Sequence, residues 1–182
     1  MDNEQGYPSY WSSVLMASVI TALIFFIVSL IGGYSTINAE PSGSLIQPAQ
    51  FISMLACLFA AVGGVFANWH YARGNDLTYK IGKGALLGLL TGVIAAIISV
   101  ILGLIWEVID PAYAQNVMDA TIANFEAMPN MTQEMIEQTR QQMEFAETPL
   151  GLLVSAGTAA IMLGIVNVVS GLIGAKIFAS EE

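Results

Sequence analysis

The sequence predicts an all-α membrane protein with four transmembrane helices and an extramembrane amphipathic helical hairpin between the third and fourth. Two observations lead to this fold class. The chain of 182 residues is 55% hydrophobic and only 10% charged, whereas soluble domains have about 25% charged residues. Its mean hydropathy is +0.68. Four apolar runs without internal Asp, Glu, Lys or Arg are also long enough to cross a hydrocarbon core of about 30 Å as helices.

The predicted spans cover residues 10–31, 48–70, 79–109 and 149–178, which form a single membrane domain with the outer segment 110–148. Gly32 and Gly33 are expected to end the first span. Thr148 and Pro149 fit the N-cap and first position of the last helix. The first ten residues carry acidic but no basic side chains, unlike a secretory signal peptide, so the first run is expected to remain as a helix.

The basic residues predict the orientation, because Lys and Arg of short loops gather on the cytoplasmic side of a membrane. Arg73, Lys80 and Lys83 lie between the second and third spans, and Lys176 lies at the end of the fourth. We therefore expect a multi-pass protein of the cell inner membrane with both termini cytoplasmic. A net charge of −9 with five basic residues argues against nucleic acid as a partner, whereas the lipid bilayer is the expected surrounding.

The outer segment 110–148 contains seven acidic residues and one basic residue. Asp110 and Pro111 fit the start of one helix, and a second is expected from about Thr132 to about Ala146. The apolar faces predict a packed hairpin, with partner or cation binding as the alternative. The acids are spread out and lack the spacing of a calcium loop. The candidate partner surface consists of Met131, Met135, Met143 and Phe145, because methionines form adaptable contact surfaces.

Small residues at four-residue spacing allow close helix packing in a bilayer, where burial alone does not drive association. The third span has such a stripe at Gly84, Gly88 and Gly92. The second span has another at Ala56, Ala60 and Gly64. We interpret them as packing faces within the four-helix bundle. A homo-oligomeric interface is the alternative.

Residues capable of chemistry are sparse, and the sequence predicts no catalytic, cofactor-binding or metal site. His70 is expected to anchor the membrane interface, and Cys57 to pack in the apolar interior. Asn167 is expected to hydrogen-bond between helices, with a substrate contact as the alternative. Glu107 and Asp110, three positions apart at the end of the third span, come nearest to a site.

Local sequence adds a resemblance. The glycine-rich residues 82–88, the residues Ile109, Asp110 and Pro111, and the Gln-, Glu- and Met-rich residues 132–138 precede a last helix that starts with proline and glycine. In this order they resemble a family of four-helix integral membrane proteins of unknown function that is common in Bacteroidota. The resemblance implies a fold and a membrane location but no activity.

Three classes of function were weighed. A non-enzymatic accessory or scaffold component, alone or in a membrane complex, fits the uncharged helices and the outer hairpin. A small oligomeric transporter or channel is the alternative, although broken helices and inverted repeats, the usual signs of transporters, are not evident. A membrane enzyme would need convergent nucleophiles, bases or metal ligands, which one histidine, one cysteine and scattered acids do not supply.

Overall fold

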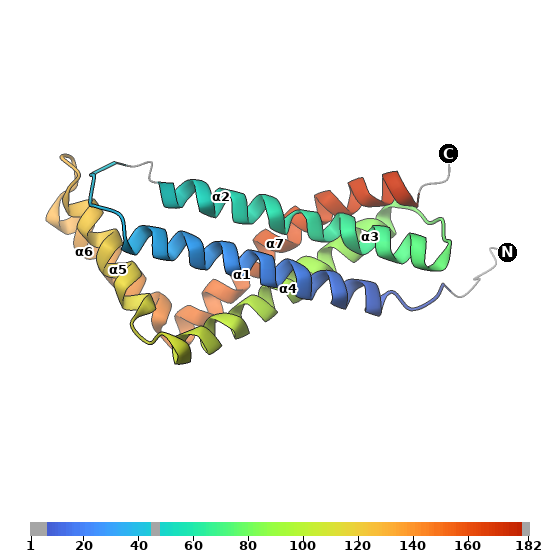
Figure 1. Ribbon diagram of the computed structural model, residues 1–182, viewed down its shortest axis with the longest axis horizontal. Helices are drawn as coiled ribbons and strands as arrows, with labels where there is room; N and C mark the ends of the chain where they lie inside the picture. The colour runs from blue at the N-terminus through green and yellow to red at the C-terminus, as the bar shows by residue number, and fades with distance from the viewer. Residues whose placement is uncertain (1–6, 45–47, 180–182) are drawn as a thin grey trace.

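The structure is a computed structural model that describes residues 7–44 and 48–179, and over these residues it contains helices and no strands. Long helices run roughly lengthwise, while α5 and α6 lie at one end of the bundle (Figure 1). Helix α1 begins, and helix α7 ends, at the end of the bundle opposite α5 and α6. The helices in chain order are α1 (Trp11–Ile37), α2 (Pro48–Ala60), α3 (Val62–Asn75), α4 (Ile81–Ile109), α5 (Tyr113–Glu126), α6 (Gln133–Glu147) and α7 (Pro149–Phe178).

Four helical stretches are long and apolar enough to cross a membrane, namely Trp11–Ile37, Met54–Asn75, Ile81–Ile109 and Pro149–Phe178. The second stretch joins most of α2 to α3. Together with the helices α5 and α6 between α4 and α7, these stretches confirm the predicted fold class. Their large apolar side chains are widely exposed on the outside of the bundle, as expected where lipid is the solvent.

Two helix ends differ from the prediction. The first helix continues through Gly32 and Gly33 and ends at Ile37. Gly33 lies against the Tyr113 side chain, where an added Cβ would collide with the ring. This glycine therefore allows close packing and does not end the helix. Asp110 does not cap α5, which begins at Tyr113. Asp110 instead follows the last residue of α4, and its carboxylate accepts a hydrogen bond from the Tyr34 hydroxyl.

The predicted helix start at Thr148 is present. The Thr148 side chain accepts a hydrogen bond from the Gly151 N–H at 3.0 Å, and Pro149 occupies the first turn of α7. Thr132 caps α6 in the same way, by accepting a hydrogen bond from the Met135 N–H. A threonine oxygen thus satisfies one of the free N–H groups at the start of each helix.

Helices α4 and α7 form the most extensive contact in the bundle. The glycine stripe of α4 faces α7. A Cβ added at Gly84 would meet Ala175 and the Gly171 carbonyl, one at Gly88 would meet the Asn167 carbonyl, and one at Gly92 would meet the Leu163 carbonyl. The backbones therefore approach more closely than any side chain permits, which increases van der Waals contact between two helices in lipid.

The second stripe is also buried. Ala56 and Ala60 lie on α2, where Ala60 packs with Ala96 of α4 and Leu163 of α7. Gly64 lies on α3 against the Asn167 carbonyl and Ser170 of α7. The two stripes of small residues thus lie inside one chain, at the contacts among its own helices. By contrast, Cys57, which we expected to pack inside, is exposed on α2.

Helices α5 and α6 share a small apolar core of Met118, Ile122 and Ile136. Asn124 of α5 joins this unit to the segment that follows α1. Its Oδ1 accepts hydrogen bonds from the N–H groups of Ser42 and Gly43, each at 3.1 Å, and its Nδ2 donates to the Ser44 carbonyl at 3.2 Å. The hairpin is therefore held against the bundle by directed hydrogen bonds as well as by α7, which contacts α6.

Candidate functional site

A polar cluster lies in the middle of the bundle, where the four spans meet. Asn167 of α7 is fully buried. Its Oδ1 accepts a hydrogen bond from the Gly64 N–H at 2.7 Å, and its Nδ2 donates to the Leu163 carbonyl at 2.9 Å. In a regular helix the Gly64 N–H would bond to the Ala60 carbonyl. A side chain that takes this N–H interrupts the ladder, which explains why the second span divides into α2 and α3 at Ala61.

Asn68 of α3 also belongs to this cluster and lies nearer the end of the bundle at which α1 begins. Its Nδ2 donates to the carbonyls of Gly64 at 2.7 Å and Gly84 at 3.2 Å, and its Oδ1 accepts from the Tyr79 hydroxyl at 2.8 Å. Burial raises the pKa of Tyr79, so this hydroxyl keeps its proton and remains a donor. Since both amides are hydrogen-bonded to the protein itself, the cluster binds helices together and offers little to a ligand.

A lysine among tyrosine rings lies at the same end. The Lys83 Nζ donates to the Tyr71 hydroxyl at 3.0 Å and lies 3.6, 4.9 and 5.8 Å from the ring centroids of Tyr7, Tyr71 and Tyr79. Cation–π attraction of this kind holds the lysine side chain among the rings. The Tyr71 hydroxyl donates in turn to the Pro8 carbonyl at 2.8 Å. These contacts fasten the start of the chain to α3 and α4.

His70 lies nearby, and its Nδ1 is 2.8 Å from the Ser13 hydroxyl of α1. This contact joins α3 to α1. Within the described residues no group of three or more His, Cys, Asp or Glu side chains could hold a metal ion.

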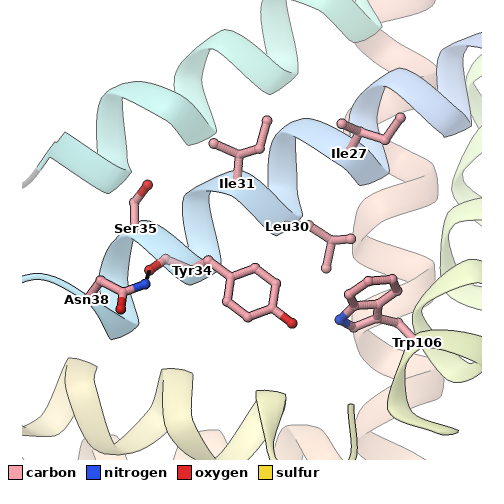
Figure 2. A pocket seen from close by; sticks show the side chains of 7 residues that line it. All are labelled: Ile27, Leu30, Ile31, Tyr34, Ser35, Asn38 and Trp106. Atoms are coloured by element: carbon pink, nitrogen blue, oxygen red, sulfur yellow. Dashed lines mark hydrogen bonds between the residues drawn. The ribbon is translucent and has the colours of Figure 1, made fainter. Parts of the chain in front are cut away.

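The remaining candidate is a groove at the other end, between α1 and the end of α4 (Figure 2). It has a volume of about 510 Å³ and is lined by Ile27, Leu30, Ile31, Tyr34, Ser35, Asn38 and Trp106. Five of these residues belong to α1 and Asn38 directly follows its last residue. All six recur at helical spacing, so they share one face. The lining changes from aliphatic to polar toward the outer end of α1.

Aromatic and acidic side chains surround Tyr34, the groove residue nearest α5. The Tyr34 hydroxyl donates to Asp110 Oδ2 at 2.6 Å, and the Tyr34 ring lies 5.1 Å from the ring of Tyr113. Burial, and then the neighbouring Tyr34 and Asp110, raise the pKa of Tyr113. Of the acidic pair expected to come nearest to a site, Asp110 thus contacts a groove residue, whereas Glu107 is exposed.

Trp106 closes the groove on the α4 side. Its ring packs edge-on against Phe26, with centroids 6.1 Å apart. The indole Nε1 is buried and faces the Tyr34 hydroxyl, with which it interacts (Figure 2). The place of Trp106 in the groove could not be predicted from the sequence, because the groove depends on how α1 and α4 diverge.

The predicted partner surface divides in two. Met131 and Met143 pack against the small core of the hairpin. Met135 and Phe145 are each 46% exposed. The exposed part of this surface is therefore confined to Met135 and Phe145 on α6.

The four spans, the small-residue contacts and the outer hairpin define a polytopic α-helical membrane protein. The chain belongs to the family described as "Protein of unknown function (DUF4199)", which it matches over residues 13–179. The expected membership of a family of unknown function is thereby confirmed. No match was found among curated proteins or among solved structures.

Proposed function

We propose that this protein is a non-enzymatic accessory or scaffold component of the inner membrane, with both termini in the cytoplasm and the hairpin of α5 and α6 outside. The observation that carries the proposal is the pair of exposed apolar side chains, Met135 and Phe145, on a helix that packs against α5 and contacts α7. A rigid base lowers the entropy that a contact must overcome. The basic residues near the opposite end support the orientation.

The partner on this surface is a second membrane protein with an apolar patch and a basic rim. Glu134, Glu137, Glu144 and Glu147 give α6 an excess of negative charge over Arg140, and complementary potentials stabilise the correct encounter.

Site-specific photocrosslinking in native membranes tests this function. A photoreactive phenylalanine analogue is placed at Met135, at Phe145 or, as a matched control, at the exposed, uncharged Gln133 at the start of the same helix. We expect Met135 and Phe145 to capture one common protein, identified by mass spectrometry, and Gln133 to capture much less. Equal capture from all three positions, or capture of lipid alone, contradicts the proposal.

The small oligomeric transporter or channel remains the alternative. The buried polar side chains at the centre of the bundle favour it, since the binding sites of transporters lie near the bilayer midplane. Against it, the amides of Asn68 and Asn167 at that depth are used by the helices themselves. Proteoliposomes that show flux of an ion or metabolite, abolished by Asn167→Leu in folded protein, would establish it.

A further inference from the structure

We propose that residues 7–10 form a strap that opens and closes over Tyr71, and that Lys83 is the latch that holds it closed. These residues precede α1 at the end of the bundle opposite α5 and α6 (Figure 1). Opening releases the Tyr71 hydroxyl and the Lys83 ammonium from the strap. The strap therefore controls whether these two groups are covered or accessible at this end of the protein.

Residues 7–9 of the strap are attached to the helices by weak, polar contacts. The Tyr7 ring lies 3.6 Å from the Lys83 Nζ, and the Pro8 carbonyl accepts a hydrogen bond from the Tyr71 hydroxyl at 2.8 Å. An exposed cation–π contact and a single hydrogen bond each contribute little. Residues 7–9 are also exposed, and segments with few buried apolar contacts open most readily. This part of the chain is therefore suited to leave the surface and return.

Tyr10 is the fixed end of the strap. It is partly buried against the apolar cluster that includes Val14 and Tyr71. Its ring meets the Tyr71 ring edge-on, with the centroids 6.4 Å apart. Helix α1 begins at the next residue, Trp11. Residues 7–9 can therefore move away while α1 stays in place.

Lys83 acts on the strap directly and through Tyr71. Its Nζ donates to the Tyr71 hydroxyl at 3.0 Å, and this hydroxyl donates in turn to the Pro8 carbonyl. Hydrogen bonds in a chain polarise one another, so a hydroxyl that accepts from an ammonium is a stronger donor. The same ammonium attracts the Tyr7 ring. One positive charge thus supports both contacts of residues 7–9 with the helices, which is why we assign it as the latch.

The side chain under the strap leads to the polar cluster in the middle of the bundle. Tyr71 is fully buried in the closed arrangement, and its ring lies 5.5 Å from that of Tyr79. The Tyr79 hydroxyl donates to Asn68 Oδ1 at 2.8 Å. Opening the strap exposes Tyr71, whereas Tyr79 keeps its partner inside the bundle. The two tyrosines therefore distinguish an open strap from a general loosening of the helices.

Electron paramagnetic resonance of a nitroxide label measures the two states of the strap. The label is attached to Ser9→Cys in a Cys57→Ala background, and the full chain is reconstituted in lipid vesicles. A closed strap gives an immobilised spectral component and an open strap a mobile one. We expect both components in the parent protein, with the immobilised one in excess. Lys83→Met removes the charge but keeps an apolar stem, and it should raise the ratio of mobile to immobilised label by about threefold.

Two further variants make this result specific to the latch. Lys80→Met is the matched control, because Lys80 is exposed and its side chain does not cap α4; it should leave the ratio unchanged. Tyr7→Leu should raise the ratio as Lys83→Met does. In the double variant Tyr7→Leu/Lys83→Met the two effects should not multiply, since both changes remove the same contact. Equal effects of Lys80→Met and Lys83→Met, fully multiplying effects, or a label immobilised in every variant would overturn the proposal.

Hydroxyl-radical footprinting tests whether the strap covers Tyr71. In Lys83→Met the oxidation of Tyr71, measured by mass spectrometry, should rise by about threefold together with the mobile label, while oxidation of Tyr79 stays as in the parent. Thermal unfolding in detergent checks that the variant is folded, and Tyr7→Leu, which changes an exposed ring, gives the same test independently of Lys83. Unchanged oxidation of Tyr71 in both folded variants, or equal increases at Tyr71 and Tyr79, would refute the strap.

Discussion

The Asn167 side chain accepts a hydrogen bond from the backbone N–H of Gly64 at 2.7 Å, and so joins the last span to the second. The bond takes a donor that would otherwise serve the helix itself. One polar side chain in the hydrocarbon region thus both divides α2 from α3 and fixes α3 against α7. This hydrogen bond lies at the centre of the bundle, so its loss should lower the stability of the whole protein.

Replacing Asn167 with Leu should destabilise the protein by about 1–2 kcal/mol, the upper range for hydrogen bonds between membrane helices. Leu has the same branched outline with methyl groups in place of the amide oxygen and nitrogen, so the change leaves no cavity and removes the acceptor of the Gly64 N–H. Unfolding by denaturing detergent measures the difference. The control is Thr158→Val on the same helix, because the Thr158 hydroxyl is exposed and bonds only locally to the Val154 carbonyl. Equal effects of the two changes would refute this role of Asn167.

A methyl group at Gly88 should separate α4 from α7, because the added Cβ would collide with the Asn167 carbonyl. We expect Gly88→Ala to cost about 1–3 kcal/mol, as overpacking does in other cores. The matched control is Gly103→Ala in the same helix, where the added Cβ meets nothing within 4 Å. That change should be neutral or slightly stabilising, since Ala favours the helix over Gly. Thermal unfolding in mild detergent compares the variants.

The glycine stripe could instead form an interface between copies of the chain. Native mass spectrometry of the same Gly88→Ala variant distinguishes this homo-oligomer from packing within one bundle. If the stripe serves the bundle, the mass distribution stays as in the parent protein while unfolding shifts. A variant that dissociates into protomers of unchanged stability would instead assign the stripe to an interface between copies.

Loss of the Asn124 amide should release the segment after α1 from the hairpin. In Asn124→Ala, the N–H groups of Ser42 and Gly43 lose their acceptor, so their hydrogen exchange should accelerate by about tenfold, corresponding to about 1.4 kcal/mol. Mass spectrometry of a peptide containing residues 40–44 measures this. The control Asn116→Ala changes an exposed position of α5 and should leave the exchange unchanged. Unaltered exchange in both variants would show that other contacts hold the segment.

The sequence predicted the spans and the hairpin because long uncharged runs and amphipathic periods are local features. It also identified the small residues that pack, since Gly84, Gly88 and Gly92 share one helix face whatever lies opposite. It did not predict the groove at Trp106, because that depends on the angle between α1 and α4. Nor did it predict the division at Ala61, which results from Asn167, more than a hundred residues away. The expected helix end at Gly33 was wrong, because a glycine that ends a helix and one that admits a neighbouring ring look alike in sequence.

The proposed orientation predicts a one-sided pattern of cysteine labelling. In a Cys57→Ala background, Gln142→Cys on α6 and Asn75→Cys at the end of α3 place single thiols at exposed positions near opposite ends of the bundle. A membrane-impermeant maleimide added to cells with a permeabilised outer envelope should label position 142 at once, and position 75 only after the inner membrane is opened. The basic residues favour this arrangement because positively charged loops remain in the cytoplasm. Labelling of position 75 before position 142 would reverse the orientation and place the hairpin inside the cell.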